Sequence, residues 1–91
     1  MSSSQRRVVI CNNRGLHARA AAKFVELAQG YDAVIHVSRD GETVNADSIM
    51  ELLMLAAGKG SEIGIDASGA QAVEVADALA ALVEAGFHED D

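Results

Sequence analysis

The stretch from Ala33 to Ala46 reads AVIHVSRDGETVNA and decides the fold class of this chain. Residues 33–38 and 42–46 are two β-prone runs, and Asp40 and Gly41 lie between them. An Asp-Gly pair between two such runs favours a tight hairpin, because both residues tolerate the positive φ angles of the turn. The sequence therefore predicts two antiparallel strands that are neighbours in one sheet.

Two further strands are predicted outside this hairpin. Residues 7–12 are rich in β-branched side chains and run into a turn composition that ends at Gly15. Residues 61–67 alternate apolar and polar side chains, which is typical of a strand with one face in water.

Three segments have the apolar spacing of amphipathic helices, namely residues 18–29, 49–57 and 71–85. A glycine follows each of them, where helices commonly end. Residues 88–91 form an acidic tail. The resulting order β-α-β-β-α-β-α predicts an α+β open sandwich, in which the helices cover a single face of the sheet.

Composition restricts the function classes. With 91 residues, the chain is expected to form one domain over residues 1–91. Its 14 acidic and 7 basic side chains give a formal charge of -7, which argues against nucleic acid and anionic membranes as partners. The longest apolar run, residues 52–57, is too short to span a bilayer, and no signal peptide pattern is present. We therefore expect a cytoplasmic protein.

The single cysteine, Cys11, follows Val8, Val9 and Ile10 in an apolar run. It has no second cysteine with which to form an internal disulfide, which fits a reducing compartment. We interpret it as a packed strand residue.

His17 is the most informative candidate for chemistry, because it lies between a glycine-containing turn and the start of a predicted helix. Backbone N–H groups at a helix start are unpaired and favour an anion there. A neutral imidazole nitrogen can act as a nucleophile at cellular pH. Arg19, in the first helical turn, can reach phosphate oxygens. On spacing alone, a helix-capping histidine beside a solvated arginine explains the pattern as well.

The segment that begins at Ser48 is a second candidate region. Ser48 can cap the short helix of residues 49–57, and an exposed serine there is also a possible phosphorylation site. That helix is apolar almost all round, which suggests an exposed docking patch, although a wholly buried helix fits as well. No pair of His, Cys or carboxylate residues has metal-ligand spacing, so we expect neither a metal nor a cofactor.

The run from Gly15 to Val25, GLHARAAAKFV, resembles the active-site signature of HPr, the histidine-containing phosphocarrier family of the phosphoenolpyruvate-dependent phosphotransferase system. Residues 45–63 resemble the serine-site helix of the same family and the strand after it. The resemblance covers nearly the whole chain. It implies an open-faced β-sandwich of four antiparallel strands covered on one side by three helices.

The resemblance also implies a role for several residues. His17 would take a phosphoryl group on Nδ1, its pros nitrogen, from phospho-enzyme I and pass it to an enzyme IIA domain. Arg19 would stabilise the phosphate, and Ser48 would be the target of an HPr kinase. The protein would be a monomeric carrier without turnover of its own. The partner-docking residues that the family implies are Leu16, Ala20, Ile49, Met50 and Leu53.

Ala20 departs from the family pattern, which usually has proline at this position. Alanine forms helices well, so we expect the helix to persist with a less rigid start.

Surface charge favours a regulatory, nitrogen-type branch (NPr-like) over sugar uptake. In sugar-branch members, lysines commonly occupy the positions of Glu26 and Glu51, and Asp47 adds a third acidic side chain here. Charge of this kind redirects partner choice. A sugar-branch HPr remains the alternative.

Two other classes of protein fit parts of the sequence. An acylphosphatase-like hydrolase would use Arg14 or Arg19 together with Asn12 or Asn13, but it leaves His17 and Ser48 unexplained. A small-ligand sensor domain would use its helices only for protein contact.

Overall fold

The computed structural model describes residues 2–89. Its elements follow the predicted order β-α-β-β-α-β-α. They are β1 (Ser2–Val9), α1 (Ala18–Gln29), β2 (Val34–Arg39), β3 (Glu42–Asn45), α2 (Ile49–Met54), β4 (Glu62–Gly69) and α3 (Ala72–Glu84), followed by a 3₁₀ turn at Gly86–His88. We call this last segment the C-terminal turn.

The four strands form one antiparallel sheet in the order β1-β4-β2-β3. The predicted hairpin is confirmed, because Arg39 of β2 pairs with Glu42 of β3 across the Asp-Gly turn. β4 lies between β1 and β2, so that Ile65 faces Arg6 on one side and Val37 on the other. All strands except β1 and β3 are therefore paired along both edges.

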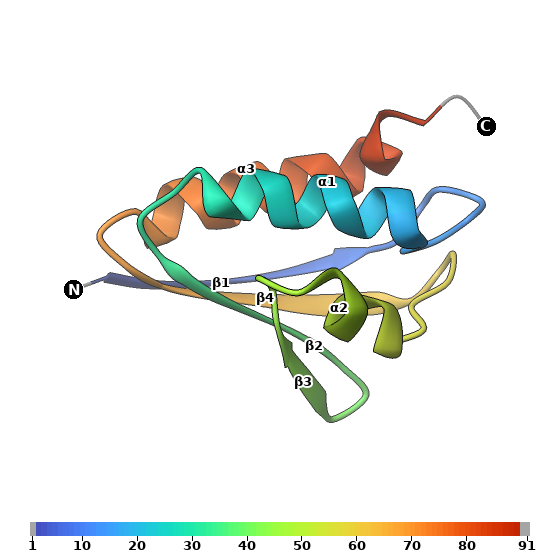
Figure 1. Cartoon of the computed structure of the whole chain (residues 1–91), viewed down its shortest axis with the longest axis horizontal. Coiled ribbons are helices and arrows are strands. Elements are labelled where there is room, and N and C mark those ends of the chain that lie inside the picture. The colour runs from blue at the N-terminus through green and yellow to red at the C-terminus, as the bar shows by residue number, and fades with distance from the viewer. Residues whose placement is uncertain (1, 90–91) are drawn as a thin grey trace.

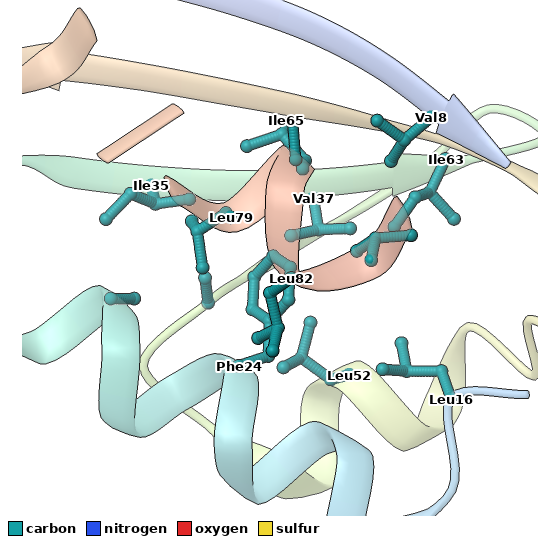
Figure 2. Close-up of a cluster of buried hydrophobic side chains, with 14 of the residues drawn as sticks. Val8, Leu16, Phe24, Ile35, Val37, Leu52, Ile63, Ile65, Leu79 and Leu82 are labelled. Atoms are coloured by element: carbon teal, nitrogen blue, oxygen red, sulfur yellow. The ribbon is translucent and has the colours of Figure 1, made fainter. Parts of the chain in front are cut away.

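The helices cover one face of this sheet. Figure 1 shows α1 and α3 side by side above β1 and β4, with α2 near β2 and β3. Figure 2 shows side chains of the strands meeting Phe24 of α1, Leu52 of α2 and Leu79 of α3. These three side chains are fully buried. The expected α+β open sandwich is thus confirmed, and its core is built from Ala, Val, Leu and Ile with Phe24 and Phe87 as the buried rings.

β1 differs from the expectation. It was predicted over residues 7–12, but it runs over Ser2–Val9. Its polar first half pairs with β4 as far as Ser2 opposite Gly69. Arg6, the residue after this half, donates to the carboxylate of Asp77 on α3 at 2.6 Å. Polar residues therefore continue an edge strand here, which apolar alternation could not reveal.

The interpretation of Cys11 as a packed strand residue was wrong. Cys11 lies beyond the end of β1 and is exposed. Its Sγ lies 3.5 Å from the carbonyl oxygens of Val83 and Glu84, at the end of α3. The strand ends before it because the chain turns toward α1.

Two other boundaries differ in ways that affect the site. α2 ends at Met54 rather than at residue 57, because Ala56 adopts a positive φ of 51° and turns the chain. Part of the predicted acidic tail is folded, since His88 belongs to the C-terminal turn. Asp90 and Asp91 lie outside the described residues.

Candidate functional site

His17 is the N-cap residue of α1. Its backbone is extended, with φ −81° and ψ 178°, and its Nδ1 accepts the backbone N–H of Arg19 at 3.3 Å. The imidazole thus replaces the usual Ser, Thr, Asp or Asn cap. Because a backbone N–H can only donate, Nδ1 carries a lone pair that points to the positive end of the helix dipole.

The turn before His17 is fixed against the end of α2. Gly15 has a φ of 67°, and its N–H donates to the Asn12 carbonyl at 3.2 Å. The next N–H, of Leu16, donates to the Ala57 carbonyl at 2.9 Å. Leu16 is itself buried, with 6% of its surface exposed. His17 therefore follows a segment that packing and hydrogen bonds hold in place.

The other nitrogen of the His17 ring faces the C-terminal segment. Nε2 contacts the carboxylate of Glu89, and the two side chains are 17% and 12% exposed. The second oxygen of this carboxylate accepts from Asn12 Nδ2 at 2.9 Å. Asn12 and His17 thus meet Glu89, which is more than 70 residues away in the sequence, at the start of α1.

The charge state of Glu89 follows from these contacts. The hydrogen bond from Asn12, and next the one from His17, hold the pKa of this carboxyl below its usual value, against a smaller opposing effect of desolvation. The positive charge of Arg14 acts in the same direction. Glu89 is therefore ionised near neutral pH and can only accept hydrogen bonds.

Arg19 lies in the first turn of α1 and is exposed. Among the residues that the structure describes, no carboxylate lies within salt-bridge distance of its guanidinium. A free guanidinium beside a helix N-terminus is well suited to bind phosphate oxygens. A nucleophilic nitrogen, a helix start and an unpaired arginine therefore occur together, which is an arrangement that suits phosphoryl chemistry.

Ser48 occupies the position expected of it. It is the N-cap of α2, and its Oγ accepts the backbone N–H of Glu51 at 3.2 Å. The carboxylate of Glu51 turns back to accept from Asn45 N at 3.3 Å. Glu51 is thus half-buried and tied to the loop, whereas Glu26 and Asp47 are exposed and line a groove between α1 and α2.

The five expected docking residues do not share one degree of exposure. Ala20 is fully buried and Leu16 almost so, because both side chains point into the core. Met50 is 71% exposed, Ile49 is 38% exposed, and Leu53 is partly buried. The exposed apolar surface is thus centred on α2. Leu16 and Ala20 belong to the buried core and not to this surface.

The described part of the chain has neither a cluster suited to a metal ion nor a membrane-spanning helix. Residues 2–89 contain no group of three His, Cys, Asp or Glu side chains placed to hold a metal ion. No helix among them is long and apolar enough to cross a membrane.

Two residues of the site were not expected to act with His17. The sequence places Asn12 only in the hydrolase alternative and Glu89 only in the acidic tail. Asn12 is 3% exposed and lies between Gly15 and Glu89, since its Nδ2 donates to both. The only feature of the sequence that pointed to Asn12 was its position close to the glycine of the turn. His17 and Glu89 are 72 positions apart in the sequence, so no local pattern could reveal their contact.

An α+β open sandwich with a histidine at a helix N-terminus and an arginine two residues later is the class of small protein that the fold and the site define. Comparison with known proteins specifies the class. The family model described as the PTS HPr component phosphorylation site matches residues 4–85. The chain belongs to the HPr family of phosphocarrier proteins.

Relatives from several bacteria have names that agree with this family assignment. Phosphocarrier protein NPr of Klebsiella oxytoca is 49% identical, covering 91% of this chain and 93% of that protein. Phosphocarrier protein HPr of Cupriavidus necator is 44% identical, covering 96% and 98%. The crystal structure of HPr from Thermoanaerobacter tengcongensis superposes with a TM-score of 0.91 at 36% identity, covering 97% and 99%.

Proposed function

We propose that the chain carries a phosphoryl group on Nδ1 of His17, accepting it from phospho-enzyme I and donating it to an enzyme IIA domain. The observation that supports this most strongly is the placement of Nδ1, whose lone pair lies at the N-terminus of α1 against the Arg19 N–H. A phosphoryl group on this nitrogen would enter the positive field of the helix start.

Charge stabilisation is the chemistry that these residues supply. In the transfer, negative charge spreads over the three equatorial oxygens of the phosphoryl group, and nearby donors lower the barrier. The backbone N–H of Arg19, which donates to Nδ1 of His17, and the Arg19 guanidinium are the donors that we assign to this role. The guanidinium makes no salt bridge within residues 2–89.

Membership of a phosphocarrier family implies a carrier rather than a catalytic enzyme. Incubation with phosphoenolpyruvate and enzyme I should add one acid-labile, base-stable phosphate per chain. Incubation with acetyl phosphate should give no sustained release of phosphate. Steady turnover of acetyl phosphate without stable labelling would instead support the acylphosphatase-like alternative.

The exposed apolar surface of α2 would dock both partners. Met50 and Ile49 are solvent-exposed at the end of the groove between α1 and α2. Methionine adapts its shape to different partners, as a relay requires. Phosphorylation of Ser48 by an HPr kinase would place about two negative charges beside these side chains and weaken docking.

Acidic residues near this surface favour a nitrogen-type branch. Glu26 and Asp47 line the groove and are exposed, so they can reject an acidic partner and attract a basic one. Glu51 contributes less, because its carboxylate is engaged by Asn45 N. The relatives carry both NPr and HPr names, so the alternative is sugar transport.

The branch can be tested by the rate of phosphate transfer from a nitrogen-type and a sugar-type enzyme I at equal concentration and low salt. We expect the nitrogen-type donor to be preferred. A preference for the sugar-type donor, followed by efficient transfer to a sugar-specific enzyme IIA, would assign the chain to carbohydrate uptake. In either branch we expect it to act as a monomer in the cytoplasm.

A further inference from the structure

We propose that Glu89 is a positioning residue that fixes the protonation pattern of the His17 ring, so that Nδ1 is the nucleophile and Nε2 keeps the proton. This inference rests on the proposed role of His17 and assigns a function to the contact between His17 and the C-terminal segment.

The two ring nitrogens of His17 have opposite partners. Nδ1 faces the N–H of Arg19, which can only donate. Nε2 faces the carboxylate of Glu89, which, when ionised, can only accept. Both contacts therefore require the same neutral tautomer, with the proton on Nε2. In the other tautomer, two N–H groups would face each other at Nδ1 and two acceptors would face each other at Nε2.

Glu89 is held in place by the segment that precedes it. Phe87 is fully buried, and its carbonyl accepts from Lys23 Nζ of α1 at 2.7 Å. The N–H of Glu89 donates to the Gly86 carbonyl at 3.1 Å, which closes the C-terminal turn. Phe87 and His88 both have positive φ angles, of 57° and 58°. Such conformations are uncommon without glycine and persist where surrounding contacts impose them.

Asn12 holds the carboxylate from the opposite side. Its Nδ2 donates to Glu89 Oε1 and to the Gly15 carbonyl, both at 2.9 Å. Its Oδ1 is buried and has no hydrogen-bond partner among residues 2–89. The amide therefore makes its hydrogen bonds through the nitrogen alone, and these bonds connect Glu89 to the turn that carries His17.

The consequence for phosphoryl transfer follows from this pattern. The Nδ1 lone pair forms the new N–P bond while the N–P bond to the phosphohistidine of the donor protein breaks, and that electron pair returns to the donor nitrogen. The proton already on Nε2 stays there. The ring becomes cationic, and its charge is paired with the Glu89 carboxylate, which is the role of an orienting carboxylate in other histidine sites.

Glu89 lies outside residues 4–85, the part of the chain that the family model matches. The match to the family model therefore does not include this contact.

The protonation pattern can be read directly by long-range ¹H–¹⁵N NMR of the His17 ring at a pH where the ring is neutral. In the unmodified protein we expect Nε2 to have the chemical shift of a protonated nitrogen and Nδ1 that of an unprotonated one. Glu89→Ala should move both shifts toward the average of the two tautomers. Glu89→Gln keeps one acceptor oxygen for two donors, Asn12 Nδ2 and His17 Nε2, and should retain the pattern only in part.

Transfer rates from phospho-enzyme I separate orientation from charge. Glu89→Ala should lower the rate by about tenfold, as loss of an orienting carboxylate does at other histidine sites. Glu89→Gln should fall between this variant and the unmodified protein. Glu84→Gln removes the same charge from the exposed end of α3 and should change neither the ring shifts nor the rate.

The outcomes are distinct. Unchanged ring shifts and rates in both Glu89 variants would overturn the inference, as would an equal loss of rate in Glu84→Gln. If Glu89→Ala disturbs the C-terminal turn, the rate of Glu89→Gln decides. A rate below that of the unmodified protein supports the inference, and an unchanged rate overturns it. Failure of the unmodified protein to accept phosphate would contradict the proposed function instead, while the ring shifts would still test the role of Glu89.

Discussion

Gly15 lies directly against Ala57, so that a Cβ atom on Gly15 would be 2.7 Å from the Ala57 carbonyl oxygen. The same atom would be 2.8 Å from the α-carbon of Gly58. This close approach brings the loop after α2 beside the segment that carries His17. The Leu16 N–H then donates to the same Ala57 carbonyl.

Gly15→Ala should therefore destabilise the protein by about 2–4 kcal/mol, because it combines a positive φ with a clash against backbone atoms. Gly41→Ala is a matched control, since Gly41 also has a positive φ but open space around it. It should cost only about 1 kcal/mol. Urea unfolding of the two variants measures the difference. Equal losses would mean that the loop after α2 does not restrain the site.

Arg19→Ala should slow phosphate transfer by about 10- to 100-fold, because one charge-stabilising donor is lost. Stability should change by less than about 0.5 kcal/mol, since Arg19 is exposed. Arg7→Ala removes the same charge from the exposed Arg7–Glu62 pair at 3.0 Å and should leave transfer unchanged. Stopped-flow transfer from phospho-enzyme I checks both variants. A rate for Arg19→Ala within twofold of the control would exclude the guanidinium from the site.

Ser48→Asp should lower the rate of transfer from phospho-enzyme I while the fold is retained. Asp keeps an acceptor for the Glu51 N–H but adds charge beside the apolar surface of α2. Ser48→Asn keeps the cap without charge and should transfer at the normal rate. If both variants are equally slow, the effect belongs to the cap and not to the charge.

The pH dependence of the C-terminal turn follows from the lowered pKa of Glu89. Because this pKa is below its usual value in the folded protein, the contact stabilises the fold above the usual carboxyl range. That contribution is lost as the pH falls through the folded-state value. A ¹³C titration of the Glu89 carboxyl should show the lowered pKa, and Asn12→Ala should raise it, since the Asn12 hydrogen bond is its largest cause. An unchanged pKa in Asn12→Ala would contradict this explanation.

Much of the fold follows from local patterns in the sequence. α1 was predicted with its observed bounds, because its apolar spacing is regular and Gly30 ends it. The hairpin was predicted correctly from Asp40 and Gly41 together with the β-prone runs on either side of them. Residues 2–6 of β1 were missed, since these polar side chains belong to an edge strand that has no apolar alternation.

The site was predictable only in part. His17 and Arg19 are two residues apart on one helix start, so a local pattern contains them both. The carboxylate that contacts His17 is 72 residues away, and only tertiary packing of Phe87 brings it close. Exposure of the docking residues also depends on packing, which is why Ala20 proved to be buried and Met50 exposed.

The most direct test of the account is to locate the phosphate after incubation with phosphoenolpyruvate and enzyme I. ³¹P and ¹⁵N NMR of the labelled protein should place one phosphoryl group on Nδ1 of His17. His17→Ala should accept none, although its circular dichroism spectrum should be unchanged. Phosphate on His36, on His88 or on Nε2 of His17 would contradict the account.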